Sequence, residues 1–172
     1  IGEKVFEFIE PFAGYGFNRS HAACYALIGY QTAYLKSRFP APFMAALLTS
    51  DADNIDRIAI EISECRDMGI EVMPPNVNES FEDFAVILDP ELKTERIRFG
   101  LNAIKNVGHM VAHEIVEERK KNGKFKTLTN FIERVATKDL NKKSIEALAK
   151  VGALDEMGER NQILASIENI LS

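Results

Sequence analysis

The stretch LNAIKNVGHMVAHEIVEER, residues 101–119, places a short polar turn between two apolar segments. Two helices that pack closely around a tight turn need apolar or small residues at fixed spacings, and a glycine where the turn ends. The residues with these properties are Ile104, Val107, Gly108, Ala112 and Ile115. This pattern predicts a helix-hairpin-helix element. The alternative is an ordinary helical hairpin within a core.

The predicted turn has the features of a phosphate site. The backbone N–H groups from Val107 to Met110 would lie at a helix N-terminus, where unpaired N–H groups and the helix dipole attract anions. Asn106 stands where many such hairpins have a first glycine, and asparagine tolerates the left-handed conformation. We therefore predict contacts with DNA phosphates by the turn residues, which are Lys105, Asn106, Val107, Gly108 and His109.

Charge is sorted along the chain, although the net charge of the 172 residues is −5. Residues 51–100 carry 13 acidic and 5 basic side chains, whereas residues 96–143 carry 12 basic and 5 acidic ones. A basic segment attracts the nucleic-acid backbone without regard to base sequence, and its binding weakens with salt. We therefore add Lys120, Lys121 and Lys124 to the predicted DNA contacts.

A second stretch, FAGYGFNRSHAACYALIGYQTAYLK at residues 12–36, runs from a polar loop into an apolar helix. Flexible glycines, a cation and hydrogen-bonding side chains before a helix N-terminus are typical of a phosphate site. The glycine spacing matches neither the P-loop nor the dinucleotide pattern. On the residues alone, a helix that begins after a turn, with Ser20 as its N-cap, is the favoured interpretation.

The remaining periodicities predict a mainly α-helical protein with a small β-hairpin. We expect a helical segment at residues 1–50, an acidic helix plus the β element at 51–100, and the helix-hairpin-helix element with C-terminal helices at 101–172. The strands are predicted near residues 84–88 and 96–99. Asn54 is the expected N-cap of one helix. The segment 144–158 is interpreted as a degenerate second copy of the hairpin. The later helices are expected at residues 111–121, 128–135, 144–151 and 160–171.

Composition narrows the class of protein. A hydrophobic content of 46% suffices for a real core, and no apolar run is long enough to span a bilayer. The chain opens at Ile1, which we interpret as a piece cut from a longer soluble chain. Cys24 and Cys65 lie in apolar helical patterns, which predicts buried reduced thiols and a cytoplasmic location. We expect no metal site, because Asp51, Asp53 and Asp56 fit no calcium loop, and His109 and His113 lack further ligands.

Five blocks of the sequence occur in the order typical of one family. They are FAGYGFNRSHAACYALIGYQTAYLK, FPAPFMAALLTSDADN, MPPNVNESFEDF, IRFGLNAIKNVG and VGALDEMGERNQIL. Together they resemble the fingers region of the bacterial DNA polymerase III alpha subunits, the family C replicative polymerases. The resemblance covers the chain from about Lys4 to Ser172. Arg19 stands where relatives often have lysine, and Asn106 where they usually have glycine.

The resemblance implies a fingers-type domain of a DNA-directed DNA polymerase, a nucleotidyltransferase of DNA replication. Its implied partners are template-primer DNA, the incoming deoxynucleoside triphosphate, other parts of the polymerase chain, and replisome subunits that include the sliding clamp. No cofactor is expected in this segment, with Mg²⁺ held in the palm of the parent enzyme, so the segment alone is predicted to be inactive. No membrane partner is expected. The implied nucleotide-binding residues are Gly14, Gly16, Asn18, Arg19, Ser20 and His21.

Two other classes remain open at this point. A non-catalytic helix-hairpin-helix DNA-binding module of a repair protein would use Gly108 and the basic segment, but would leave residues 14–21 without a role. A purely structural interaction domain would bind neither nucleotide nor DNA. Closely spaced aspartates in a polymerase palm upstream of Ile1 would favour the polymerase.

Overall fold

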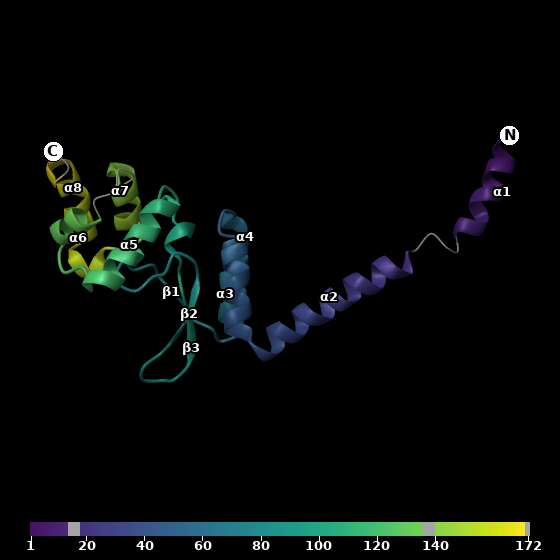
Figure 1. The fold of residues 1–172 in the computed structure, drawn as a ribbon, viewed down its shortest axis with the longest axis horizontal. Coiled ribbons are helices and arrows are strands. Elements are labelled where there is room, and N and C mark those ends of the chain that lie inside the picture. Colours follow the sequence, from purple (N-terminus) through teal and green to yellow (C-terminus); the bar gives the residue numbers. More distant parts are fainter. Residues whose placement is uncertain (14–17, 136–139, 171–172) are drawn as a thin grey trace. The chain divides into compact units, whose positions relative to one another are not determined.

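The structure is a computed structural model that describes residues 1–13, 18–135 and 140–170 (Figure 1). The chain divides into two compact units, residues 1–39 and residues 40–172.

Residues 1–39 contain helices α1 (Gly2–Ala13) and α2 (Arg19–Arg38). The N-cap of α2 is Asn18, whose Oδ1 accepts the backbone N–H of His21 at 3.1 Å, so the prediction of Ser20 as the cap is wrong. Asn18 has the extended backbone that a cap requires, whereas Ser20 already lies in the first helical turn. The helix ends at Arg38, just before Pro40.

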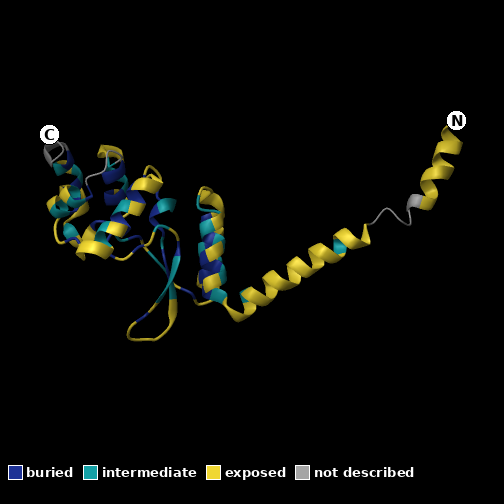
Figure 2. Ribbon diagram, viewed as in Figure 1, coloured by how far each residue is buried: buried dark blue, intermediate teal, exposed yellow. Residues whose placement is uncertain are grey.

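Side chains of α2 are exposed or half-exposed along its whole length (Figure 2). From the apolar character of this helix we predicted that Cys24 is buried. Leu27 is 58% exposed and Cys24 is also exposed, so this prediction is wrong for the structure described here. The physical reason is that no side chain among the described residues of 1–39 is buried, so this unit has no core of its own.

The second unit begins with two helices on a small sheet. Helix α3 (Pro40–Ser50) packs on β2 and β3, and α4 (Ile55–Asp67) follows it. The strands are β1 (Val72–Met73), β2 (Ala85–Leu88) and β3 (Glu95–Arg98), in the order β1-β3-β2. The antiparallel pairing of β2 with β3 confirms the predicted hairpin, whereas the parallel strand β1 was not predicted.

A first core lies between these helices and the sheet. Asn54 caps α4 as predicted, because its side chain accepts the N–H of Arg57 at 3.2 Å. On α4 itself, Ile58 and Cys65 are buried, but Ile55 is exposed. The buried apolar residues of this core are Ala41, Met44, Ala45, Leu48, Ile58, Cys65, Ile70, Phe84 and Ile97.

A second core joins the C-terminal helices. These are the 3-10 turn η1 (Leu101–Ala103), α5 (His109–Asn122), α6 (Leu128–Arg134), α7 (Lys142–Lys150), the 3-10 turn η2 (Asp155–Met157) and α8 (Arg160–Ile170). Phe99 contacts both cores and so joins them. The mainly α-helical class with a small β-hairpin is therefore confirmed. The largest fully buried side chains of this core are Leu101, Ile115, Phe131, Ile145, Leu148, Leu154 and Ile167.

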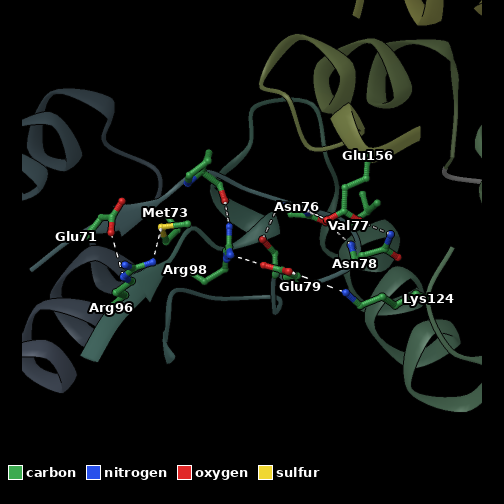
Figure 3. Close-up of polar contacts among 12 residues, drawn as sticks. Glu71, Met73, Asn76, Val77, Asn78, Glu79, Arg96, Arg98, Lys124 and Glu156 are labelled. Atoms are coloured by element: carbon green, nitrogen blue, oxygen red, sulfur yellow. Dashed lines mark hydrogen bonds and ion pairs between the residues drawn. The ribbon is translucent and has the colours of Figure 1, made fainter. Parts of the chain in front are cut away.

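Residues 76–80, which we call the linking segment, bind three distant parts of the second unit (Figure 3). Asn78 is 5% exposed, and its amide accepts the N–H of Phe125 at 2.7 Å and donates to the Phe125 carbonyl at 3.0 Å. The same amide and that of Asn76 each donate to the Glu156 carboxylate at 2.9 Å. On the other side, Glu79 accepts from the buried Arg98 of the sheet.

Candidate nucleic-acid interface

The first hairpin consists of η1, the turn at residues 104–108, and α5. The side chains of Ile104, Val107, Ala112 and Ile115 are all buried, which confirms the packing that the spacing predicted. Asn106 adopts the left-handed conformation at φ 70°, and Val107 N–H closes the turn onto the Ile104 carbonyl at 3.0 Å. This closure directs the chain from the turn into the N-terminus of α5.

That N-terminus is open. Gly108 is the N-cap of α5 and has no side chain to accept a hydrogen bond, and the first turn of the helix contains no acidic residue. Within the described part of the chain, the backbone N–H groups of Gly108, His109 and Met110 donate to no acceptor. A Cβ atom placed on Gly108 would meet nothing within 4 Å. Several N–H groups at the positive end of a helix are therefore left without an acceptor in the described part of the chain.

Polar contacts from the preceding loop support this turn. The backbone N–H of Asn102 donates to the Glu82 carbonyl at 2.9 Å, and its side-chain amide donates to Asp83 at 3.1 Å. His109 Nδ1 lies 3.2 Å from Asn102 Oδ1, which as a carbonyl oxygen can only accept, so Nδ1 carries the proton. His113 Nδ1 lies 2.9 Å from a Glu82 carboxylate oxygen. This hydrogen bond raises the pKa of His113 above its ordinary value.

The second hairpin consists of α7, residues 151–159 and α8. Gly152 adopts φ 82° and ends α7, with its own N–H bonded to Ala149 and that of Ala153 bonded to Leu148. Arg160 binds both carboxylate oxygens of Asp155 beneath this turn, at 2.8 and 2.7 Å, and this contact lowers the pKa of Asp155. The segment interpreted as a second copy, residues 144–158, therefore contains most of α7 and a glycine turn, and the second helix of the hairpin, α8, begins just after it.

The α8 N-terminus of this second hairpin is occupied by the protein itself. The Glu159 carboxylate accepts the backbone N–H of Gln162 at 3.0 Å and the side-chain amide of Asn161 at 3.1 Å. A carboxylate in this position takes up the N–H groups that would otherwise bind an external anion. The two hairpins thus differ at the place where phosphate would bind.

Lysines from two elements surround a cavity beside the first turn. The cavity has a volume of about 260 Å³ and lies between the turn and α7. Lys105 comes from the turn, and Lys143 and Lys150 come from α7. We did not predict Lys143 and Lys150 as site residues. Their spacing of seven residues places them on one face of a helix, which is the signal that could have identified them. The other lining residues are Ile104, Asn106, Glu146, Ala147 and Val151.

The predicted Lys120, Lys121 and Lys124 lie at the opposite end of α5. Eleven residues separate His109 from Lys120, which corresponds to about 16 Å along the helix. Lys120 pairs with Glu117 at 2.7 Å, and Lys124 lies 4.0 Å from Glu79. The structure brings Lys105, Asn106, Val107, Gly108 and His109 together on one turn, but it does not bring these three lysines to that turn. Their contact with DNA stays a prediction.

The predicted nucleotide-binding residues belong to residues 1–39. Arg19, Ser20 and His21 are all exposed in the first turn of α2, and the His21 ring contacts the Tyr25 ring with centroids 4.5 Å apart. The Asn18 amide caps this turn, so it is directed at the helix rather than at an external group. Gly14 and Gly16 lie outside the described residues. The role of the whole set stays a prediction.

In residues 1–13, 18–135 and 140–170, the His, Cys, Asp and Glu side chains form no group of three that could hold a metal ion. None of the described helices combines the length and the apolar character that crossing a bilayer requires.

The geometry of the first hairpin agrees with the comparison to known families. The sequence pattern of the helix-hairpin-helix motif matches residues 69–164, and the chain belongs to this family. Over nearly its whole length the chain is also similar to proteins named DNA polymerase III subunit alpha. It is 48% identical to that of Thermus aquaticus over 98% of the chain and 46% identical to that of Deinococcus radiodurans over 99%. The chain spans only 13% and 12% of the length of these two relatives.

Proposed function

We propose that the chain is the fingers segment of a bacterial replicative DNA polymerase and binds template-primer DNA through the first hairpin. The observation that carries this proposal is the open N-terminus of α5, where three backbone N–H groups have no acceptor among the described residues and a Cβ atom on Gly108 would meet nothing within 4 Å. Similarity to DNA polymerase III alpha subunits over 98% of the chain supports the same function.

The hairpin contacts the DNA backbone rather than its bases. The N–H groups of Gly108, His109 and Met110 hold one phosphate, and Lys105 adds a charge beside them. Because phosphates are the same at every base pair, binding is independent of sequence and weakens as salt rises. This suits an enzyme that moves along its template.

The first turn of α2 binds the triphosphate of the incoming nucleotide. Arg19 supplies a forked donor, Ser20 a hydroxyl and His21 an imidazole on one exposed turn. In this proposal Gly14 and Gly16 allow the preceding loop to approach the phosphates closely, and Asn18 holds the helix end. These groups stabilise charge that develops on the triphosphate during nucleotidyl transfer.

The complete polymerase chain performs nucleotidyl transfer with Mg²⁺, which aspartates outside this segment would hold. The segment contributes positioning and charge, so the 172-residue chain alone extends no primer in a magnesium-containing assay. Its further partners in this proposal are the rest of the polymerase chain and the replisome with its sliding clamp, in the cytoplasm.

Gly108→Asp tests the DNA contact. The backbone at Gly108, with φ −72° and ψ 153°, suits an aspartate N-cap, and its carboxylate would occupy the free N–H groups as Glu159 does in the second hairpin. We expect binding of the chain to a short DNA duplex to weaken at least tenfold, while its melting temperature stays equal or rises.

Thr127→Asp is the matched control. Thr127 caps α6 by accepting the N–H of Asn130 at 3.1 Å, so aspartate keeps the cap and adds the same charge away from the hairpin turn. Little change in DNA affinity is expected. Equal weakening by both variants would show a general charge effect and contradict the hairpin contact.

Arg19→Ala tests the nucleotide contact in the complete polymerase chain. Loss of a charged hydrogen bond costs about 1.5–3 kcal/mol, which lowers kcat/KM for the nucleotide by about one to two decades. Arg19 is exposed, so its replacement by alanine should change the melting temperature little. Unchanged kinetics together with a lower melting temperature would make Arg19 a structural residue.

A further inference from the structure

The cavity between the first turn and α7 has the properties of a second phosphate site. We propose that Lys105, Lys143 and Lys150, which we call the α7 lysine site, bind the DNA backbone phosphate next to the one held by the hairpin N–H groups. The inference rests on the proposed function and extends it to an element that the hairpin contact does not include.

The α7 lysine site carries a net positive charge. Among the described residues, Lys105 and Lys143 have no carboxylate partner. Lys150 lies 3.6 Å from Glu146, but its side chain is 63% exposed, and such pairs contribute little. Three lysines and one glutamate leave a local charge of +2. The site therefore attracts an anion, and Glu146 is the one group in it that opposes binding.

The lining of the cavity also suits a bound phosphate. Its volume is about 260 Å³, and apolar groups of Ile104, Ala147 and Val151 line it together with the three lysines. Lysine stems pack along apolar surface while their ammonium groups stay in water. Apolar lining groups also exclude water from part of a bound phosphate and strengthen its attraction to the ammonium groups.

The α7 lysine site lies next to the open N–H groups of the first hairpin. Lys105 and Asn106 line this cavity, and the open N–H groups begin two residues later at Gly108. The two sites are therefore neighbours on the same turn, as required by a ligand that carries phosphates at regular intervals. A nucleic-acid backbone has this property, and a single free phosphate does not. The far end of α5 attracts a phosphate less strongly. Lys120 and Lys121 share a surface there with Glu114, Glu117 and Glu118.

The test measures binding of the chain to a short DNA duplex at several salt concentrations. Each phosphate contact contributes about 0.9 to the slope of log affinity against log salt. Because the three lysines share one phosphate, the double variant Lys143→Gln and Lys150→Gln should reduce this slope by up to about 0.9 and weaken binding by roughly tenfold. The matched double variant Lys120→Gln and Lys121→Gln should reduce the slope by less.

Glu146→Gln gives an effect of the opposite sign, which unfolding cannot mimic. Removal of the one carboxylate in the site should strengthen binding by about two- to fivefold. An unchanged slope for the α7 double variant, with binding still weakened by Gly108→Asp, would overturn the α7 lysine site alone. Absence of any DNA binding by the wild-type chain would instead overturn the proposed function and this site with it.

Discussion

The first hairpin joins the 3-10 turn η1 to α5 and the second joins α7 to α8, each around a left-handed turn, yet one turn is open and the other is filled. Asn106 and Gly152 have similar φ angles, 70° and 82°. Next to the first turn the helix N-terminus lacks an acceptor, whereas around the second turn Asp155, Glu156 and Glu159 supply carboxylates. The comparison teaches that repetition of a backbone motif does not repeat its binding capacity. That capacity depends on whether the protein's own side chains satisfy the helix end.

The largest expected effect comes from release of the second hairpin. Asn78→Ala would leave the buried N–H and carbonyl of Phe125 without partners and would remove one donor to Glu156. We expect a loss of about 3–4 kcal/mol in the free energy of unfolding, measured in urea. Asn102→Ala is the matched change beside the first hairpin. It removes only exposed contacts to Asp83 and His109 and should cost about 1 kcal/mol or less. Equal losses would mean that both hairpins are held alike.

Glycine-to-alanine changes should separate the two turns next. A Cβ atom on Gly152 would lie 2.3 Å from the Arg160 guanidinium and 2.9 Å from an Asp155 oxygen, in a backbone conformation that alanine disfavours. We expect Gly152→Ala to cost about 2–3 kcal/mol of unfolding free energy. At Gly108, where a Cβ meets open space, alanine should cost about 1 kcal/mol or less. If Gly108→Ala lowered the free energy of unfolding more than Gly152→Ala does, the first turn and not the second would be the crowded one.

A smaller effect is an opposite response of the hairpins to pH. The pKa of His113 is raised by Glu82, so its stabilisation is present below about 6.5, its ordinary value, and is lost as pH rises through the raised pKa. The pKa of Asp155 is lowered by Arg160, so its stabilisation is present above the ordinary value of 3.8 and is lost as pH falls.

Amide hydrogen exchange across a pH series would measure both responses. Above the raised pKa of His113, opening near α5 should increase, and His113→Gln should remove that dependence. In acid, opening near α8 should increase, and Asp155→Asn should remove it. A parallel response of both helices to pH would contradict the separate origins.

The smallest expected effect concerns the left-handed residues themselves. Asn106→Gly suits φ 70° and should change the free energy of unfolding by about 0.5 kcal/mol or less. The reciprocal change Gly152→Asn should cost more, although asparagine tolerates the same φ, because the space there is filled. Thermal melts of the two variants would compare conformation with crowding directly.

Sequence patterns predicted the elements whose causes are local. The strands near residues 84–88 and 96–99, the N-cap at Asn54 and the hairpin packing of Ile104 and Ala112 were all confirmed. Strand β1 has two residues and pairs in parallel with a strand 25 positions later, so no periodicity could reveal it. The cap of α2 was assigned to Ser20 because Asn18 and Ser20 are both good caps, and only the backbone decides between them.

Parts of the candidate interface were beyond local reasoning. Lys105 was predicted from the turn, but the proximity of Lys143 depends on the packing of α7 against that turn. Lys120 and Lys124 were counted as available charges, since their partners Glu117 and Glu79 become evident only in the folded chain. Asn78 lies in a formal glycosylation pattern, NES at residues 78–80, and its pairing with Phe125 could not be read from that pattern.

The linking segment has a consequence for the order in which the protein is made. Asn76 binds Glu156, which lies 80 positions later in the chain. A ribosome adds about 5–20 residues per second. About 4–16 s therefore pass between the synthesis of Asn76 and that of Glu156. During that interval the Asn76 side chain lacks its carboxylate, while the sheet partner Arg98 is already available to Glu79. Nascent chains stalled just before residue 156 should therefore be far more open to proteolysis at this segment than completed chains.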